Sequence, residues 1–158
     1  MPASSASKPP LATNPARAAG YSTRSLIEKL GIKAEQRMAV LHAPANYARL
    51  LGPLPEQVVR SETLGEPLDF VHCFSTSRQE LAELFPRLKA ALADRGICWI
   101  AWPKRTSKAA TIKISTDLDE NGVREIGLAN GLVDVKVAAI DEIWSGLKFV
   151  YRLKDRGK

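Results

Sequence analysis

The stretch that decides the fold is Leu68-Asp-Phe-Val-His-Cys-Phe-Ser-Thr-Ser77, followed by Arg78 to Arg95 and then by Gly96-Ile-Cys-Trp-Ile-Ala-Trp-Pro103. Its first and last parts, Phe70 to Phe74 and Ile97 to Trp102, are apolar in both strand phases, as strands covered by helices on both faces are. The middle part has apolar residues at spacings of three and four, which predicts a helix with one buried stripe: Leu81, Leu84, Phe85, Leu88 and Leu92. The stretch therefore predicts a parallel strand–helix–strand unit with a right-handed crossover.

Local signals place the ends of this helix. Ser77-Arg-Gln-Glu80 fits a capping box, in which the serine oxygen accepts the Glu80 amide and the Glu80 carboxylate accepts the Ser77 amide. Gly96 is the expected helix stop, and Pro86 predicts a kink or a restart. Four polar side chains are expected to face water: Arg78, Glu83, Arg87 and Asp94.

The rest of the chain fits one domain around this unit. Residues 1–20 are rich in Ala, Ser and Pro and predict a disordered basic tail, 21–153 a single domain, and 154–158 a short basic tail. Further strands are expected at Met38 to His42, Gln57 to Ser61, Leu132 to Ile140 and Leu147 to Leu153, and helices at Tyr21 to Leu30 and Thr116 to Asn130. The six-residue link between the last two strands predicts an antiparallel pair.

Charge and cysteine content narrow the function classes. The formal net charge is +6, but residues 25–151 hold 16 basic and 16 acidic side chains, so the excess lies in the ends and argues against nucleic-acid binding. No apolar run long enough for a membrane span or a signal peptide occurs, which predicts a cytoplasmic protein. Cys73 and Cys98, expected toward opposite ends of the sheet, are interpreted as buried and reduced, and no cluster of metal ligands is recognisable.

The element order resembles the Rossmann-like domain of S-adenosylmethionine-dependent methyltransferases. Asp69-Phe70-Val71 and the segment from Leu88 to Ile100 look like the fourth and fifth strand regions of that fold. The likeness runs from Arg37 to Leu153, with one strand-helix unit missing between Ser61 and Leu68. It implies a three-layer α/β fold whose mostly parallel sheet ends in an antiparallel strand pair.

A second resemblance is carried by short motifs, and it is to the bacterial family catalogued as domain of unknown function 3052. The motifs are Gly52 to Pro55, Trp102 to Lys104, Gly131 to Val137 and Trp144 to Val150. This likeness implies a bacterial cytoplasmic origin and supplies no catalytic residues.

Candidate ligand-binding residues follow from the strand ends, because ligands of open α/β sheets bind beyond the carboxyl ends of the strands. These ends deliver His42 and Asn46, Ser75 and Ser77, Trp102, and Trp144 on the final link. Glu62 stands where such folds carry a ribose-binding acid, although a solvated turn acid is the simpler interpretation. The first strand is followed by His-Ala-Pro-Ala-Asn, without the glycines that a conventional nucleotide site uses.

The basic loop after the second apolar strand is the strongest candidate. Lys104, Arg105, Ser107 and Lys108 combine charges and hydroxyls that can hold phosphate or carboxylate, and a solvated loop is the alternative. Trp102 and Trp144 either floor a ligand or cover the core. His42 is either a general base or a strand-end histidine bonded to the loop backbone.

The leading interpretation is a non-catalytic Rossmann-like module without assigned catalytic residues, metal or cofactor. It would bind a small anionic ligand or a protein partner at the sheet edge. The alternative is a divergent methyltransferase that uses S-adenosylmethionine, with Glu62 among its contacts. A third possibility is an obligate subunit of a larger complex.

Overall fold

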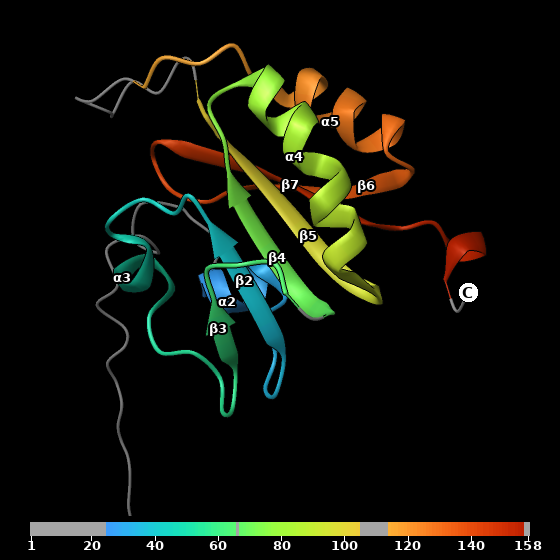
Figure 1. The fold of residues 1–158 in the computed structure, drawn as a ribbon. Coiled ribbons are helices and arrows are strands. Elements are labelled where there is room, and N and C mark those ends of the chain that lie inside the picture. Colours follow the sequence, from blue (N-terminus) through green and yellow to red (C-terminus); the bar gives the residue numbers. More distant parts are fainter. Residues whose placement is uncertain (1–24, 66, 105–113, 157–158) are drawn as a thin grey trace, which may run out of the picture.

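A computed structural model describes residues 25–65, 67–104 and 114–156. The elements that precede the central unit are α2 (Leu26–Leu30), β2 (Arg37–Leu41), α3 (Tyr47–Leu51) and β3 (Val59–Ser61). Those that follow are β4 (Leu68–Phe74), α4 (Arg78–Ala91), β5 (Leu92–Pro103), α5 (Glu120–Ala129), β6 (Leu132–Ala139), β7 (Trp144–Tyr151) and the 3-10 turn η2 (Leu153–Asp155). Strands and helices alternate along the described chain except at β3–β4 and β6–β7, where two strands follow each other (Figure 1).

The strands form one six-stranded sheet with the order β3-β2-β4-β5-β7-β6. The first four strands pair in parallel, and β7 pairs antiparallel with both β5 and β6. β3 pairs with β2 alone and lies at the sheet edge, and no strand or helix separates it from β4 in the described chain. The predicted three-layer α/β fold, one strand-helix unit short, is confirmed.

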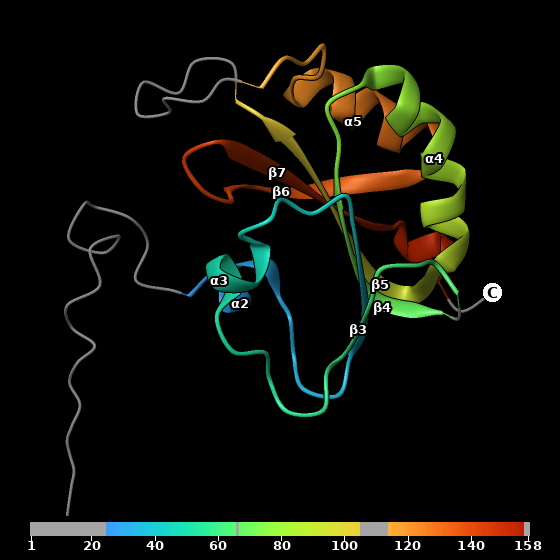
Figure 2. The same cartoon turned by 60° about the vertical axis from the view of Figure 1, so that its left-hand side comes forward.

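Helices lie on both faces of the sheet. Figure 2 shows α2 and α3 on one side and α4 and α5 on the other. Leu81, Phe85 and Leu88 of α4 are fully buried against the sheet, and Tyr47 of α3 packs on the opposite face. Two apolar clusters result, one on each face, as strands apolar in both phases require.

The central unit differs from the prediction in its boundaries. α4 runs without interruption through Pro86, which lies on the exposed side, where water can hydrate the carbonyl left without a donor. β5 already begins at Leu92, so Gly96 is not a helix stop. It lies where the pairing register between β4 and β5 shifts, and a Cβ there would come within 2.8 Å of the Leu68 carbonyl oxygen.

Two further expectations are corrected. β7 begins at Trp144, so this residue belongs to the strand and not to the preceding link. Cys73 and Cys98 do not lie toward opposite ends of the sheet, because Cys73 pairs with Ile100, only two residues beyond Cys98. Both thiols are free and buried in the same cluster, and burial raises their pKa values. No helix in the described ranges is long and apolar enough to cross a bilayer.

Candidate functional site

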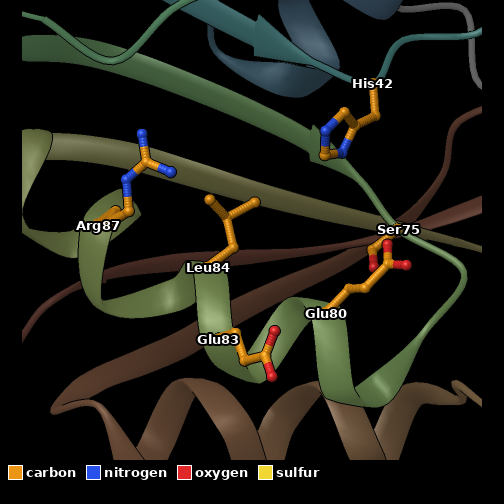
Figure 3. A pocket seen from close by; sticks show the side chains of 6 residues that line it. All are labelled: His42, Ser75, Glu80, Glu83, Leu84 and Arg87. Carbon is orange, nitrogen blue, oxygen red and sulfur yellow. The ribbon is translucent and has the colours of Figure 1, made fainter.

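A crevice opens at the carboxyl ends of β2, β3 and β4, between these strands and α4. It consists of two adjoining cavities of about 330 and 220 Å³, which share His42, Leu84 and Arg87. The larger is also lined by Ser75, Glu80 and Glu83, and the smaller by Leu41, Glu62, Thr63 and Leu64. Figure 3 shows His42 and Ser75 at the strand ends above Glu80 of α4, with Arg87 at the far end. The crevice therefore draws on three strands and one helix.

The backbone turns sharply at the crevice directly after β2. His42 has a φ of 57°, the left-handed conformation that glycine adopts without strain. Histidine tolerates this region better than most residues, at a cost of roughly 1–2 kcal/mol. The missing glycine, which argued against a nucleotide site, thus does not prevent the turn: the chain makes it with His42 itself.

The turn between β4 and α4 is capped without the Glu80 carboxylate, which is therefore available to the crevice. Ser77 caps α4 by accepting the Glu80 amide at 3.2 Å, as predicted. The Ser77 amide, however, donates to Ser75 Oγ at 3.4 Å, and Ser75 Oγ donates to the Ser77 carbonyl at 3.2 Å. Only half of the expected capping box is therefore present, and the Glu80 carboxylate lines the larger cavity instead.

The charged lining of the crevice is mainly acidic. Glu62, Glu80 and Glu83 contribute three carboxylates, and Arg87 contributes one guanidinium. None of the ion pairs found in the described part of the chain involves these four side chains. Glu83 accepts a hydrogen bond from Gln79 Nε2 at 3.2 Å, on the same helix. The crevice thus favours a ligand with net positive charge.

A buried hydrogen bond fixes the far end of the loop that follows His42. It joins Tyr47 Oη and His72 Nδ1 at 2.9 Å, and both side chains are almost fully buried. Burial lowers the pKa of His72 to about 3 and raises the pKa of Tyr47. Since His72 Nε2 has no partner among the described atoms, this histidine is a neutral structural group, as its place in a buried strand predicted.

The polar groups near the end of β5 form hydrogen bonds within the protein. Lys104 Nζ donates to the Asp141 carbonyl at 2.8 Å, and the Asp141 carboxylate accepts the Ile143 and Trp144 amides. Trp102 and Trp144 are 5% and 7% exposed, so both cover the core rather than floor a ligand. We call this end of the sheet, as far as the structure describes it, the closed end, because its polar groups bond within the protein and its tryptophans are buried.

The predicted site residues thus separate into three groups. His42, Glu62 and Ser75 come together at the crevice, with Ser77 just behind it as the helix cap. Asn46 is exposed at the start of α3 but does not line either cavity. Lys104, Trp102 and Trp144 have structural contacts, while Arg105, Ser107 and Lys108 lie outside the described residues.

Sequence reasoning missed two charged residues of the crevice. Glu83 and Arg87 are exposed, as expected, but they also lie beside the partly buried Leu84 of α4 and line the cavity, which was not expected. Their spacing of four residues puts them on one face of the helix, which was the available signal. The missing strand-helix unit leaves that face uncovered.

Searches of known structures find similar folds. A methyltransferase described as SAM-dependent from Aquifex aeolicus is 13% identical, with a TM-score of 0.55 over 88% of this chain and 94% of that one. Fibrillarin from Aeropyrum pernix, with natively bound S-adenosyl-L-methionine, is 14% identical, with a TM-score of 0.52 over 85% and 72% of the two chains. Magnesium protoporphyrin IX methyltransferase from Synechocystis PCC 6803, with bound SAH, is 11% identical, with a TM-score of 0.51 over 80% and 78%. The chain has the Rossmann-like fold of these methyltransferases.

This similarity corrects the leading interpretation from the sequence. A non-catalytic module that binds an anionic ligand or protein partner at the sheet edge is wrong as the main interpretation, because the neighbours favour the methyltransferase alternative. The physical reason lies in the described side chains at the two ends of the edge. Lys104 donates to the Asp141 carbonyl, and the charged lining of the crevice is mainly acidic.

Comparisons of the sequence with known families and proteins find no match: no family model matches the chain, and no curated protein matches it in sequence. The resemblance to domain of unknown function 3052 is therefore not confirmed. In the ranges that the structure describes, no group of three or more His, Cys, Asp or Glu side chains is placed to hold a metal ion.

Proposed function

We propose that this protein binds S-adenosylmethionine in the crevice and transfers its methyl group to an acceptor. The observation that carries the proposal is the place of the crevice, at the carboxyl ends of three neighbouring parallel strands. Ligands of open α/β sheets bind at this edge, and the larger cavity is within the usual range for small-molecule sites.

The side chains of the crevice fit the chemistry of this ligand. At neutral pH, S-adenosylmethionine carries a sulfonium, an ammonium and one carboxylate, which gives it a net positive charge. Three carboxylates against one guanidinium complement that charge. Leu41, Leu64 and Leu84 supply apolar contacts of the kind that a purine ring needs.

Individual residues have distinct roles in this proposal. Glu62 follows β3 and would accept hydrogen bonds from the ribose hydroxyls, as acids in this position do in related nucleotide sites. Arg87 would pair with the ligand's carboxylate, and Glu80 with its ammonium. When bound, the ligand supplies a methyl group activated by a positively charged sulfur.

His42 is the candidate proton acceptor. Its side chain is exposed at the crevice and makes no hydrogen bond with another described residue. An imidazole is a common general base and is suited to take the proton that an oxygen or nitrogen acceptor loses on methylation. The strained turn at His42 fixes its Cα at the mouth of the crevice.

Calorimetry with S-adenosylmethionine and S-adenosylhomocysteine tests the binding step. Glu62→Gln should weaken binding by about tenfold, since it removes one charge-assisted hydrogen-bond acceptor. Glu142→Gln is the matched control, because Glu142 is also an exposed glutamate but does not line either cavity. Absence of binding at millimolar ligand would contradict the proposal.

The transfer step requires a separate test. Release of S-adenosylhomocysteine is followed while the protein is incubated with nucleic-acid, protein and small-molecule acceptor pools. We expect His42→Gln to slow release by about 100-fold while the affinity for S-adenosylmethionine stays within threefold. A variant that turns over as fast as the wild type would remove His42 from the mechanism.

A further inference from the structure

Three lysines gather on the sheet face opposite to that of α4. Lys136 of β6 and Lys148 of β7 are direct cross-strand partners, and Lys148 is in turn the partner of Trp99 in β5. The Trp99 indole nitrogen donates to the Leu30 carbonyl at 2.8 Å, which identifies this face as the one that α2 covers. Lys33 follows the end of α2, and its ammonium is near enough to act on the charge of Lys148; with Lys136 and Lys148 it forms what we call the lysine triad.

The lysine triad is an unfavourable arrangement for a protein without a ligand. Like charges directly opposite each other on neighbouring strands destabilise a sheet. Burial, followed by the ammonium groups of Lys136 and Lys33, lowers the pKa of Lys148. Lys136 Nζ also donates to the Lys29 carbonyl at 3.3 Å, which holds it beside the end of α2. The fold therefore fixes positive charges close together.

No ion pair found in the part of the chain that the structure describes joins a lysine of the triad to a carboxylate. All ion pairs found there have arginine as the cation, and none includes a lysine. Elsewhere on the surface the same chain pairs its cations well, as Arg124 does with both Glu120 and Asp134. A local conflict of this kind is typical of a functional site.

We infer that the lysine triad is a binding site for a phosphate group. Phosphate carries about two negative charges and three acceptor oxygens, which match ammonium donors on three separate segments. The indole of Trp99 beside Lys148 limits water on one side and strengthens the attraction. The site lies on a different sheet face from that of α4, and it does not depend on methyl transfer.

The test uses the full-length protein and pyrophosphate as the probe. At a pyrophosphate concentration ten times the dissociation constant, mass action predicts a rise of about 5 °C in Tm. Lys148→Met and Lys136→Met keep the aliphatic stem and remove the charge, so both should abolish the rise. Lys148→Met should also have a higher Tm than the wild type without ligand, since the repulsion is removed, whereas Lys136→Met also loses the bond to the Lys29 carbonyl. Lys154→Met, on η2, is the matched control and should behave like the wild type.

The outcomes separate a specific site from a general salt effect. An equal rise with sodium chloride at the same ionic strength, or an undiminished rise in Lys148→Met and Lys136→Met, would overturn the inference. A second arm uses a twelve-nucleotide single-stranded RNA to ask whether the phosphate belongs to a nucleic acid. RNA that binds, loses affinity in both variants and is displaced by pyrophosphate supports the triad as its site. RNA binding that both variants keep, together with no response to pyrophosphate, overturns it.

Discussion

The two ends of the sheet's carboxyl edge use the same kinds of side chain in opposite ways. At the end of β5, Lys104 and Asp141 bond to backbone groups, and two tryptophans close the surface. At the ends of β2 and β4, His42, Glu80 and Arg87 line open space. A charged side chain near a strand end is therefore a candidate ligand contact only when the fold does not use it for a bond within the protein.

The largest expected effect concerns the closed end. Trp102→Ala removes a side chain that is 5% exposed and packed in the core, so it should lower the free energy of unfolding by about 3–5 kcal/mol. Urea titration measures this change. The affinity for S-adenosylmethionine, measured below the unfolding transition, should stay within threefold. A large loss of affinity in the folded variant would mean that the two ends are not separate.

The next effect concerns the Tyr47–His72 bond behind the open end. The pKa of His72 is about 3 in the folded protein and about 6.5 in the unfolded chain, so only the unfolded state binds a proton between these values. Stability is therefore complete above pH 6.5 and falls below it. We expect a loss of about 2 kcal/mol between pH 7.5 and pH 5 in urea titrations. His72→Gln should flatten this dependence, and an unchanged slope in that variant would contradict the assignment.

A smaller effect tests whether Lys104 is structural. Lys104→Met keeps the stem but loses the charge-assisted bond to the Asp141 carbonyl, which should lower stability by about 1 kcal/mol. Ligand binding at the open end should not change. Lys154→Met is the control, since its exposed side chain has no such bond. Equal stability of the two variants would return Lys104 to the list of candidate ligand contacts.

The smallest effect is that of His42→Gly, at the turn after β2. His42→Gly relieves the left-handed strain but adds freedom to the unfolded chain, so it should raise the free energy of unfolding by about 0.5 kcal/mol. His42→Val should lower it by about 1–2 kcal/mol, because a β-branched residue is poorly tolerated at positive φ. Urea titrations of the two variants should therefore give changes in the free energy of unfolding with opposite signs. A stabilising valine would show that the turn is relaxed in solution.

The sequence predicted the parallel core of the fold because its signals are local and strong. Strands β4 and β5 are apolar in both phases, and Ser77 caps α4 with the expected oxygen. The end of α4 was misjudged because Gly96 has two possible roles, and only the register with Leu68 shows that it serves a strand irregularity. The register between two strands cannot be predicted from the residue pattern of either strand alone.

The site was predicted only in part for a similar reason. His42, Ser75 and Glu62 follow from strand ends, which sequence can place. Glu83 and Arg87 line the crevice because the missing strand-helix unit leaves their face of α4 uncovered. The structural role of Lys104 depends on the Asp141 carbonyl, 37 residues away in the chain. Whether a polar group is bonded is set by neighbours distant in sequence, so the residue types at the strand ends could not show that Lys104 is bonded to Asp141.

The short edge strand β3 has a consequence for local unfolding. It has three residues and one partner strand, whereas β4 is paired on both sides and buried, so β3 opens at a lower free energy. Glu62 follows directly after β3, so a ligand held by Glu62 would bind only while β3 is paired. Amide hydrogen exchange at Val59 to Ser61 should then slow when the crevice fills, while exchange in β4 stays unchanged. The edge of the sheet would act as a sensor of occupancy without any movement of its core.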